Sequence, residues 1–425
     1  MIESILYSLK KVIPHSIFAF FQPAYHISLS FLGAVIYGFP SRRLKVVAVT
    51  GTKGKTSVTE LVNAILEEAG YETAVSNTIR FKIGKTSEDN LYKMSMPGRF
   101  FIQKFLKRAA AAGCTYAVIE VTSQGALLHR HRFICYDALI FTNLAPEHIE
   151  AHGSYENYVR AKLAIAEAAA KSTKKRTLLI ANADDKVTDL FLKKDFTEKR
   201  LYSLDDAKPY DLHKEGFDMT VQNVKIHSKL SGEFNIYNEL AAITLADAED
   251  ISIDTSKKAL EKFSGIRGRV EKIDAGQDFT VIVDYAHTPD SLQKLYNVYK
   301  GTRRICVLGN TGGGRDTWKR DEMAKIAESE CDEIILTNED PYDDNPRKIV
   351  DDMAQAISPA AREKKLRVIM DRREAIAKAL SLAHSGDSVL ITGKGTDPYI
   401  MGPNNAKQPW SDAKVAREEL VRIRK

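Results

Sequence analysis

The chain has 425 residues, of which 44% are hydrophobic and 28% charged. This length allows two or three domains with separate cores, and the composition excludes disordered and fibrous proteins. The net charge of +6 is small and spread along the chain, so we expect no binding to nucleic acid. The cysteines form no CxxC pair, and we expect all of them to be reduced and to bind no zinc. They are Cys114, Cys135, Cys306 and Cys331.

The N-terminal segment, residues 1–45, is rich in apolar and aromatic side chains. Its longest uninterrupted apolar run is well short of the roughly 20 residues that span a bilayer, and no cleavage site of a signal peptide follows it. We expect a short hydrophobic helical segment. Two interpretations of it remain open: helices that pack on the body of the protein, or an anchor at a membrane surface that Arg42 and Arg43 assist.

From residue 45 onward, short β-branched runs alternate with helical patterns. Residues 45–50 have the character of a buried parallel strand, and a helical pattern follows from 57 to about 69. This alternation predicts an α/β domain with a parallel sheet. Further strands are expected at 73–75, 116–120, 138–141 and 177–180, and helices at 98–112 and 154–172.

A change of pattern at 197–232 predicts a small β-rich extension, which a helix at 236–248 follows. A hinge is expected near 264–268, and a second α/β pattern begins beyond it. We therefore predict a central domain at 46–266 and a C-terminal domain at 267–425. The strands expected in the C-terminal domain lie at 279–284, 304–308, 333–337, 367–370 and 388–392.

A glycine-rich loop joins the first predicted strand to the first helix. The backbone N–H groups of such a loop close around phosphate oxygens, and the helix N-terminus adds partial positive charge. Lys55 is expected to reach the β- and γ-phosphates, and the Thr56 hydroxyl to ligate Mg²⁺. Val49 stands where the strict pattern has its first glycine, so this is a variant of the loop. Its residues are Gly51, Thr52, Lys53, Gly54, Lys55, Thr56 and Ser57.

Three further side chains suit metal chemistry. Glu120 ends a predicted strand at the carboxyl edge of the sheet, where a carboxylate faces the ligand crevice, although a surface residue is an equal alternative. Two glutamates and two histidines within 147–152 form a candidate hard-metal site, with His148 as the expected ligand. Lys162 follows on a predicted helix and alone would be an ordinary solvated lysine.

These motifs, in this order, resemble those of the Mur ligases. They are closest to the branch that adds the third residue to UDP-MurNAc-dipeptide. The resemblance implies a central P-loop-type ATPase domain and a C-terminal Rossmann-like α/β domain. It also implies an ATP-dependent, ADP-forming ligase that joins an amino acid to a muramyl-peptide-type carboxylate in peptidoglycan precursor synthesis. Further segments that carry it are Thr142–Gly153, Tyr158–Lys162, Asn235–Ala242, Gly268–Glu271, Asp284–Asp290, Gly309–Arg320, Asp371–Arg373 and Gly393–Gly395.

The resemblance assigns roles to single residues. Lys55, Glu120, His148 and Lys162 would be catalytic, and Thr56, Glu120, His148 and Lys162 would hold two Mg²⁺ ions. Lys162 matches a family lysine that is carbamylated. The loop 51–57 would bind ATP together with Asn238, Arg269 and Asp284. The residues expected to contact substrate are Ser95, Ser123, Arg130, Tyr342, Gly393 and Lys394.

The sequence also departs from the family. The 45 hydrophobic residues at the N-terminus stand where the tripeptide-synthetase branch carries a UDP-binding domain, so the acceptor is either UDP-linked or lipid-linked, or a partner supplies that domain. Gln124 replaces a family histidine, and the glycine loop at 309–316 is one residue longer than usual. Tyr342 takes the place of the arginine that selects diaminopimelate, so we carry no specificity for that amino acid over.

We therefore expect a cytoplasmic enzyme that acts on small molecules, either free or peripheral at the inner membrane through residues 1–40. Two other hypotheses stay open. One is a different ligase of the superfamily, such as folylpolyglutamate synthase, although Asp284–Asp290 fits the cell-wall branch better. The other is a nucleotide-binding scaffold at the membrane surface without catalysis, against which the retained Glu120, His148 and Lys162 count.

Overall fold

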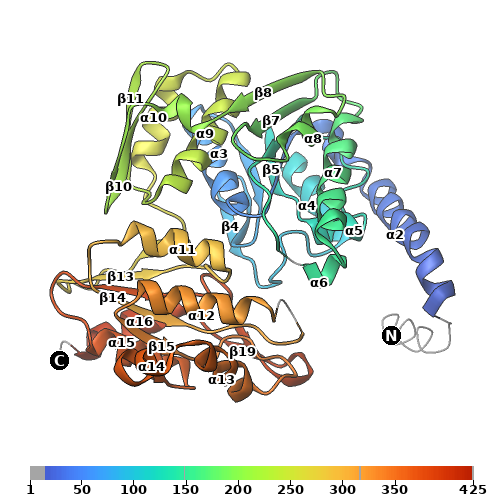
Figure 1. The fold of residues 1–425 in the computed structure, drawn as a ribbon. Helices are drawn as coiled ribbons and strands as arrows, with labels where there is room; N and C mark the ends of the chain where they lie inside the picture. The colour runs from blue at the N-terminus through green and yellow to red at the C-terminus, as the bar shows by residue number, and fades with distance from the viewer. Residues whose placement is uncertain (1–14, 148, 315–316, 424–425) are drawn as a thin grey trace. The chain divides into compact units, whose positions relative to one another are not determined.

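The computed structural model describes residues 15–147, 149–314 and 317–423. Its contacts divide the chain into two compact units, whose elements are drawn in Figure 1. The domain boundaries predicted from the sequence stay predictions. Unit 1 comprises residues up to Ala145, Glu156–Ser203 and Ala241–Ser252, and unit 2 comprises Pro146–Tyr155, Leu204–Leu240 and Ile253–Lys425.

An eight-stranded sheet forms the centre of unit 1, in the order β4-β3-β2-β5-β1-β6-β7-β8. From β2 to β8 in this order the strands run parallel, and β3 and β4 are antiparallel to their neighbours. The apolar side chains of β1, β5 and β6 are buried, as strands covered on both faces require. The predicted parallel sheet is confirmed. The strands are β1 (Lys45–Thr50), β2 (Thr73–Ser76), β3 (Arg80–Ile83), β4 (Thr86–Asp89), β5 (Tyr116–Glu120), β6 (Ala138–Phe141), β7 (Leu178–Asn182) and β8 (Glu198–Tyr202).

Helices connect these strands, and those expected from the sequence are present. The helix α3 follows β1 and packs on β1, β2 and β5, whereas α2 packs on α4. None of the described helices combines the length and the hydropathy that a membrane span needs. The helices are α2 (His15–Tyr37), η1 (Pro40–Arg43), α3 (Lys55–Glu68), α4 (Arg99–Ala111), α5 (Ser123–Leu127), α6 (Ile149–His152), α7 (Tyr155–Ala170) and α8 (Thr188–Leu192).

The connections of β1 and β6, which are neighbours, leave in opposite directions along the sheet. The chain runs from β1 through α3 to β2 on one side, and from β6 through α7 to β7 on the other. The carboxyl ends of two such strands leave a crevice in which α/β proteins bind ligands. The loops after β1 and β6 therefore meet at this edge, and the end of β5 lies beside them.

The predicted β-rich extension at 197–232 is divided between two sheets. Its first part is β8, at the edge of the large sheet. The rest forms a three-stranded antiparallel sheet of β9 (Tyr210–His213), β10 (Gly216–Val221) and β11 (Val224–Ser228). The alternation of apolar and polar residues along a strand does not indicate which sheet the strand joins. The two parts could therefore not be separated from the sequence.

Two helices follow this small sheet, α9 (Glu233–Ala248) and α10 (Ile253–Lys262). The Glu239 side chain on α9 is fully buried, and its Oε1 accepts a hydrogen bond from the Ser228 hydroxyl. Its Oε2 has no partner among the described residues. Burial therefore raises the pKa of Glu239 to about 8.

Unit 2 is built on a six-stranded sheet in the order β12-β13-β17-β14-β15-β16, in which β12 is antiparallel and the other strands are parallel. The strand β17 lies between β13 and β14, although it follows both in the chain. All five strands predicted in this region are confirmed. They are β13 (Thr280–Val283), β14 (Arg304–Leu308), β15 (Glu333–Leu336), β16 (Leu366–Val368) and β17 (Ser388–Ile391), with β12 (Glu271–Lys272) at the edge.

Helices cover the sheet of unit 2 and enclose a core on each face. Leu292 and Met323 belong to one core, and Ile376 and Ala416 to the other. The helices are α11 (Pro289–Val298), α12 (Lys319–Glu330), α13 (Pro346–Ala356), α14 (Pro359–Lys365), α15 (Arg372–Ser381) and α16 (Asp412–Ile423), and a small pair of strands, β18 (Tyr399–Met401) and β19 (Lys407–Pro409), precedes α16.

A disulfide joins Cys306 of β14 to Cys331, and the two Cα atoms are 6.1 Å apart. The prediction that all four cysteines are reduced is therefore wrong for this pair. Cys114 and Cys135 are free and buried. The two bonded residues are 25 positions apart, and the sequence could not show that α12 returns the chain to the strand beside β14.

Candidate active site

The loop between β1 and α3 has a backbone that requires glycine at two positions. Gly54 is the N-cap of α3 with φ of 81°, and no side chain caps the first turn of this helix. Gly51 has φ of +149°, and a Cβ atom there would lie 2.0 Å from the Thr142 hydroxyl oxygen. The loop thus runs close to the segment after β6 and ends at an uncapped helix N-terminus, which favours a bound anion.

The segment after β6 holds this loop in place. The Thr52 N–H donates to the Asn143 carbonyl at 2.8 Å, and the Lys53 N–H donates to the Asn143 side-chain oxygen at 2.9 Å. In return, the Thr142 hydroxyl donates to the Lys53 carbonyl at 2.7 Å. The Thr52 hydroxyl also lies 2.9 Å from the Tyr158 hydroxyl of α7. Thr142, Asn143 and Tyr158, from two further predicted motifs, therefore meet the loop.

Two lysine side chains contact the same carbonyl group of the loop. Lys55 Nζ donates to the Gly51 carbonyl at 3.0 Å and to the Thr52 carbonyl at 2.9 Å. Lys162 Nζ, on α7, donates to the Gly51 carbonyl at 2.6 Å and approaches the Thr50 hydroxyl at 3.4 Å. Lys162 is 1% exposed, so it is not the solvated helix lysine that its position alone would suggest. Both expected lysines lie at the phosphate loop.

Glu120, at the end of β5, is 3% exposed and faces the first turn of α3. Its Oε2 accepts a hydrogen bond from the Thr56 hydroxyl at 3.0 Å, and its Oε1 lies 4.0 Å from Lys55 Nζ. Thr78 donates to the same carboxylate through its backbone N–H at 3.2 Å and through its hydroxyl at 3.1 Å. Glu120 therefore belongs to the crevice, and Thr78 is a member of the site that the sequence did not reveal.

A carboxylate and a hydroxyl in contact beside a phosphate loop are the hard oxygen donors that Mg²⁺ prefers. Thr56 and Glu120 fit that ion. His148, the third predicted ligand, lies outside the described residues. Within the described part of the chain, no group of three or more histidine, cysteine, aspartate or glutamate side chains is placed to hold a metal ion.

The other predicted nucleotide contacts belong to unit 2. The Asn238 amide on α9 donates to the Asn235 side chain at 2.9 Å. The Arg269 guanidinium lies over the Tyr285 ring, 4.4 Å from its centroid. Asp284 accepts hydrogen bonds from the backbone N–H groups of Val270 at 2.7 Å and Ala286 at 2.6 Å. Arg269 and Asp284 are therefore neighbours, just before β12 and just after β13, and Asn238 lies on α9.

His287 and the acidic segment at 146–155 also belong to unit 2. His287 Nε2 lies 3.2 Å from the Glu147 carboxylate, and its Nδ1 lies 2.6 Å from the Tyr285 carbonyl. His152 is buried, with 8% of its surface exposed. The contacts with Glu147 and with the Tyr285 carbonyl give His287 a defined orientation in this unit.

Three predicted substrate residues lie in unit 1. Ser95 precedes α4 and is buried, and its carbonyl accepts a hydrogen bond from the Ser76 hydroxyl at 3.0 Å. Ser123 is buried at the start of α5. Arg130 follows α5 and donates to the Met96 carbonyl at 2.5 Å. The structure brings Ser95 and Arg130 to adjacent segments.

The other three predicted substrate residues lie in unit 2. Lys394 is 1% exposed and donates to the Asp340 carboxylate at 2.8 Å and to the Tyr399 carbonyl at 2.6 Å. Gly393 has φ of +103°, and a Cβ there would lie 2.3 Å from the Glu339 carboxylate. The Tyr342 N–H donates to the Met401 carbonyl at 3.1 Å. These contacts hold the 339–342 loop against the 393–401 segment.

Comparison with known proteins places this geometry in a family. Residues 49–246 match the Mur ligase middle domain, and residues 268–395 match the Mur ligase glutamate ligase domain. The UDP-N-acetylmuramyl-tripeptide synthetase of Roseiflexus sp. (strain RS-1) is 36% identical over an alignment that covers 94% of this chain and 83% of that protein.

Solved structures agree with the sequence comparison. A UDP-N-acetylmuramoyl-L-alanyl-D-glutamate–2,6-diaminopimelate ligase is 27% identical with a TM-score of 0.61, covering 90% of this chain and 79% of its own. The Mycobacterium tuberculosis folylpolyglutamate synthase complexed with ADP and AMPPCP has a TM-score of 0.69 over 87% of this chain and 93% of its own. At 17% identity the second structure shows a shared fold alone. The predicted fold class and ligase class are confirmed: the chain belongs to the Mur ligase family of ATP-dependent, amide-bond-forming ligases.

Proposed function

We propose that this Mur ligase joins an amino acid to the carboxylate of a muramyl-peptide-type acceptor, with ADP and phosphate as products. The contact between Thr56 and Glu120 at 3.0 Å, beside a glycine loop at the carboxyl edge of the sheet, is the observation that carries the proposal. It supports ATP bound with Mg²⁺ in unit 1. The names of the relatives supply the class of acceptor.

The reaction has two steps whose atoms balance. An oxygen of the acceptor carboxylate attacks the γ-phosphorus of ATP, the bond to the β–γ bridging oxygen breaks, and ADP leaves. The amine nitrogen of the amino acid then attacks the acyl carbon, phosphate departs with the bridging oxygen, and the nitrogen loses a proton. The protein orients the reactants and stabilises the developing charge, as in other phosphoryl transfers.

Each residue at the loop has a proposed task. The backbone of Gly51–Ser57 holds the phosphates, and the Lys55 ammonium moves from the loop carbonyls to the β- and γ-phosphate oxygens. Thr56 and Glu120 hold one Mg²⁺, which supplies charge neutralisation when bound. Asn238, Arg269 and Asp284 remain predicted contacts of the nucleotide, and His148 remains a predicted metal ligand.

Lys162 is proposed to act as a carbamate. Its Nζ and that of Lys55 both contact the Gly51 carbonyl, so two ammonium groups share one small region of the loop. Like charges this close repel each other, and carbamylation replaces one of them with a carboxylate. The new carboxylate would ligate a second Mg²⁺.

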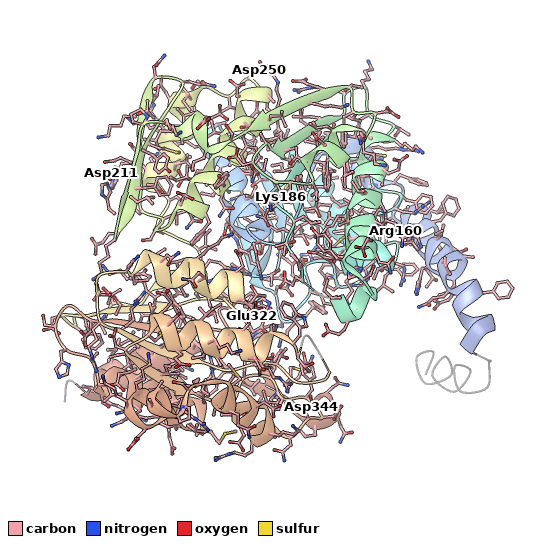
Figure 2. All side chains as sticks on the ribbon, viewed as in Figure 1. Arg160, Lys186, Asp211, Asp250, Glu322 and Asp344 are labelled. Atoms are coloured by element: carbon pink, nitrogen blue, oxygen red, sulfur yellow. A yellow bond between two sulfur atoms is a disulfide. The ribbon has the colours of Figure 1, made fainter. Side chains whose placement is uncertain are left out.

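We also propose contact with an anionic membrane surface through α2. Five of the exposed apolar residues of α2 recur at helical spacing along one side: Phe21, Tyr25, Leu32, Val35 and Ile36, which we call the apolar stripe. Phe31 is exposed as well, and it contacts the rings of Phe39 and Phe133. Side chains of this helix extend away from its ribbon in Figure 2. The exposed Arg42 and Arg43 follow the helix, and a basic border beside an apolar stripe suits an anionic lipid surface.

The ligase proposal is tested by release of ADP, screened over amino acids with UDP-linked, lipid-linked and folate acceptors. We expect ADP release that depends on both a muramyl-peptide acceptor and an amino acid. Release with folate and glutamate alone would instead support the folylpolyglutamate alternative. Failure of the purified chain to bind ATP with Mg²⁺ would refute the proposal.

Two further measurements test the finer claims. The carbamate is expected to give a ¹³C signal in protein equilibrated with ¹³C-bicarbonate, and this signal should vanish in Lys162→Ala. For the membrane contact, Leu32→Glu should reduce flotation with anionic vesicles, whereas Leu201→Glu, at an exposed leucine of β8, should not. Equal flotation of both variants would contradict a role for the apolar stripe.

A further inference from the structure

Val270 has a backbone conformation that a valine rarely adopts. Its φ of 49° lies in the left-handed region, where the branched side chain crowds the backbone. No other β-branched residue in the described part of the chain has a positive φ. Strain of this kind persists only where the surrounding contacts enforce it. The strained residue directly follows Arg269, a predicted contact of the nucleotide.

Two sets of contacts hold Val270 in this conformation. Its N–H donates to one carboxylate oxygen of Asp284 at 2.7 Å, and the other oxygen of Asp284 accepts from the Ala286 N–H at 2.6 Å. The Val270 side chain packs against the core of unit 2 that contains Leu292 and Met323. Asp284 thus fixes the backbone of Val270 while the core fixes its side chain. The residue cannot rotate to a negative φ without losing one of these contacts.

The turn that precedes Val270 is held by further contacts within unit 2. The Arg269 N–H donates to the Ile266 carbonyl at 3.0 Å, and the Gly268 N–H donates to the Glu271 carboxylate at 2.8 Å. Gly268 has φ of +62°, and a Cβ there would lie 2.5 Å from the Gly395 carbonyl carbon. The backbone is therefore fixed on both sides of Arg269.

The Arg269 side chain is held by an aromatic ring. Its guanidinium carbon lies 4.4 Å from the centroid of the Tyr285 ring, within the range of a cation–π contact. No carboxylate in the described part of the chain pairs with this guanidinium. A guanidinium that stacks on a ring keeps its N–H groups available for an anion. Asp284 and Tyr285 thus hold the backbone beside Arg269 and its side chain, respectively.

We propose that Asp284 and Tyr285 are positioning residues for Arg269, and that Asp284 acts on the nucleotide only through the strained turn at Val270. The resemblance to the family predicts a direct contact of Asp284 with the nucleotide, yet each of its carboxylate oxygens accepts a backbone N–H. Relaxation of Val270 to a negative φ would change the direction of the chain at Arg269 and move the guanidinium off the Tyr285 ring. This inference rests on the proposed binding of ATP and assigns tasks to residues of that site.

A double-mutant cycle on the affinity of the full-length chain for an ATP analogue with Mg²⁺ tests the role of Asp284. Asp284→Ala releases the Val270 N–H, and we expect about tenfold weaker binding. Glycine adopts a positive φ without strain, so in a Val270→Gly background the same change should weaken binding by only about threefold. A direct contact with the nucleotide would be lost equally in both backgrounds, and an equal loss would overturn the proposal.

Asp274→Ala is the matched control in the same unit. Asp274 also accepts a backbone N–H, that of Gly276 at 2.8 Å, but Gly276 has φ of 82° and no side chain that would be strained there. This variant should bind the ATP analogue as wild type does. If Asp274→Ala weakened binding as much as Asp284→Ala, general destabilisation would explain both results, and Asp284 would have no positioning role.

Two substitutions of Tyr285 test the stacking. Tyr285→Leu removes the ring and should weaken binding of the ATP analogue by about twofold to fivefold, whereas Tyr285→Phe keeps the ring and should restore most of this loss. Equal weakening in both variants would mean that the hydroxyl matters and the ring does not, which contradicts the role given to Tyr285. Unchanged binding in Tyr285→Leu would contradict it as well.

Denaturant unfolding tests the strain without any nucleotide. Both Val270→Ala and Val270→Gly lose packing against the core, but only glycine adopts φ of 49° at no cost. Val270→Gly should therefore unfold at a higher denaturant concentration than Val270→Ala, the reverse of the order at a negative φ. A more stable Val270→Ala would refute the strained turn and with it the proposal. If the wild-type chain binds no ATP analogue, the proposed function fails, yet this comparison still decides whether the strained turn exists.

Discussion

Two buried lysines, one in each unit, have the same exposure and different surroundings. Lys162 and Lys394 are each 1% exposed. Lys394 donates to the Asp340 carboxylate at 2.8 Å and lies 3.5 Å from Asp397, so two carboxylates surround its charge. Lys162 instead donates to the backbone of the phosphate loop, where Lys55 is its neighbour.

The difference shows that burial alone does not mark a catalytic lysine. A lysine between carboxylates joins two segments by ion pairs, and its charge is balanced within the protein. A lysine that contacts a phosphate loop beside a second cation is instead placed to meet a ligand or to be modified. Substitutions of these two residues should therefore affect different properties of the protein.

The largest effect is expected from Lys162→Ala. This change removes the proposed carbamate ligand, so turnover should fall by about a thousandfold or more, and added bicarbonate should not restore it. ADP release measures the effect. Lys171→Ala, at an exposed lysine just beyond α7, should retain full activity. Near-wild-type turnover of Lys162→Ala would show that Lys162 has no role in the reaction. Lys162 and Lys394 would then not differ in the way proposed here.

Lys394→Met should act on stability. It removes the lysine that pairs with the buried Asp340 and Asp397, and breaking comparable buried pairs costs about 3–5 kcal/mol. Denaturant unfolding should show this loss, while ATP affinity in the remaining folded protein stays near wild type. Lys414→Met, at an exposed lysine of α16, is the control. A stable Lys394→Met variant that has lost activity would show that Lys394 contacts a substrate.

Gly51→Ala tests the phosphate loop that Lys162 contacts. The new Cβ would lie 2.0 Å from the Thr142 hydroxyl, so the loop must move and ATP affinity should fall by about tenfold. Gly70→Ala, at a positive φ with open space around it, should leave ATP affinity unchanged. Nucleotide titration separates the two. Wild-type affinity for ATP in Gly51→Ala would mean that the loop can move without weakening nucleotide binding.

Glu239→Gln extends the comparison to a buried acid that has no cation. The pKa of Glu239 rises from 4.5 to about 8, so folding takes up a proton between these values and stability falls as pH rises through this window. Glutamine does not titrate. The free energy of unfolding of the variant, relative to that of wild type, should therefore increase by more than about 1 kcal/mol between about pH 5.5 and about pH 8.5. If the free energies of unfolding of Glu239→Gln and wild type changed with pH in parallel, the result would contradict a protonated Glu239.

Much of the fold could be predicted because its strands are short β-branched runs that end in polar or glycine-rich loops. The phosphate loop and Glu120 were candidates from their places after β1 and at the end of β5, whereas Lys162 was a candidate only through the resemblance to the family. Thr78 could not be found in this way. It lies beyond the end of β2, and only the register of β2 on β5 brings it to Glu120.

Other contacts depend on strand order, which local pattern does not contain. The pairing of β8 with β7 separates it from the small sheet, and the return of α12 brings Cys331 to Cys306. Arg99 was missed for a similar reason, since its hydrogen bond to the Leu128 carbonyl depends on how α4 lies against the end of α5.

The position of β17 constrains how unit 2 can form during synthesis. Residues 388–391 separate β13 from β14 in the sheet, although residues 309–387 of the chain lie between β14 and β17. While a ribosome is still making that stretch, the two earlier strands have exposed edges and an open space between them. The nascent chain therefore presents unpaired backbone for a long interval, which is the condition under which chaperones bind and strands from two chains associate.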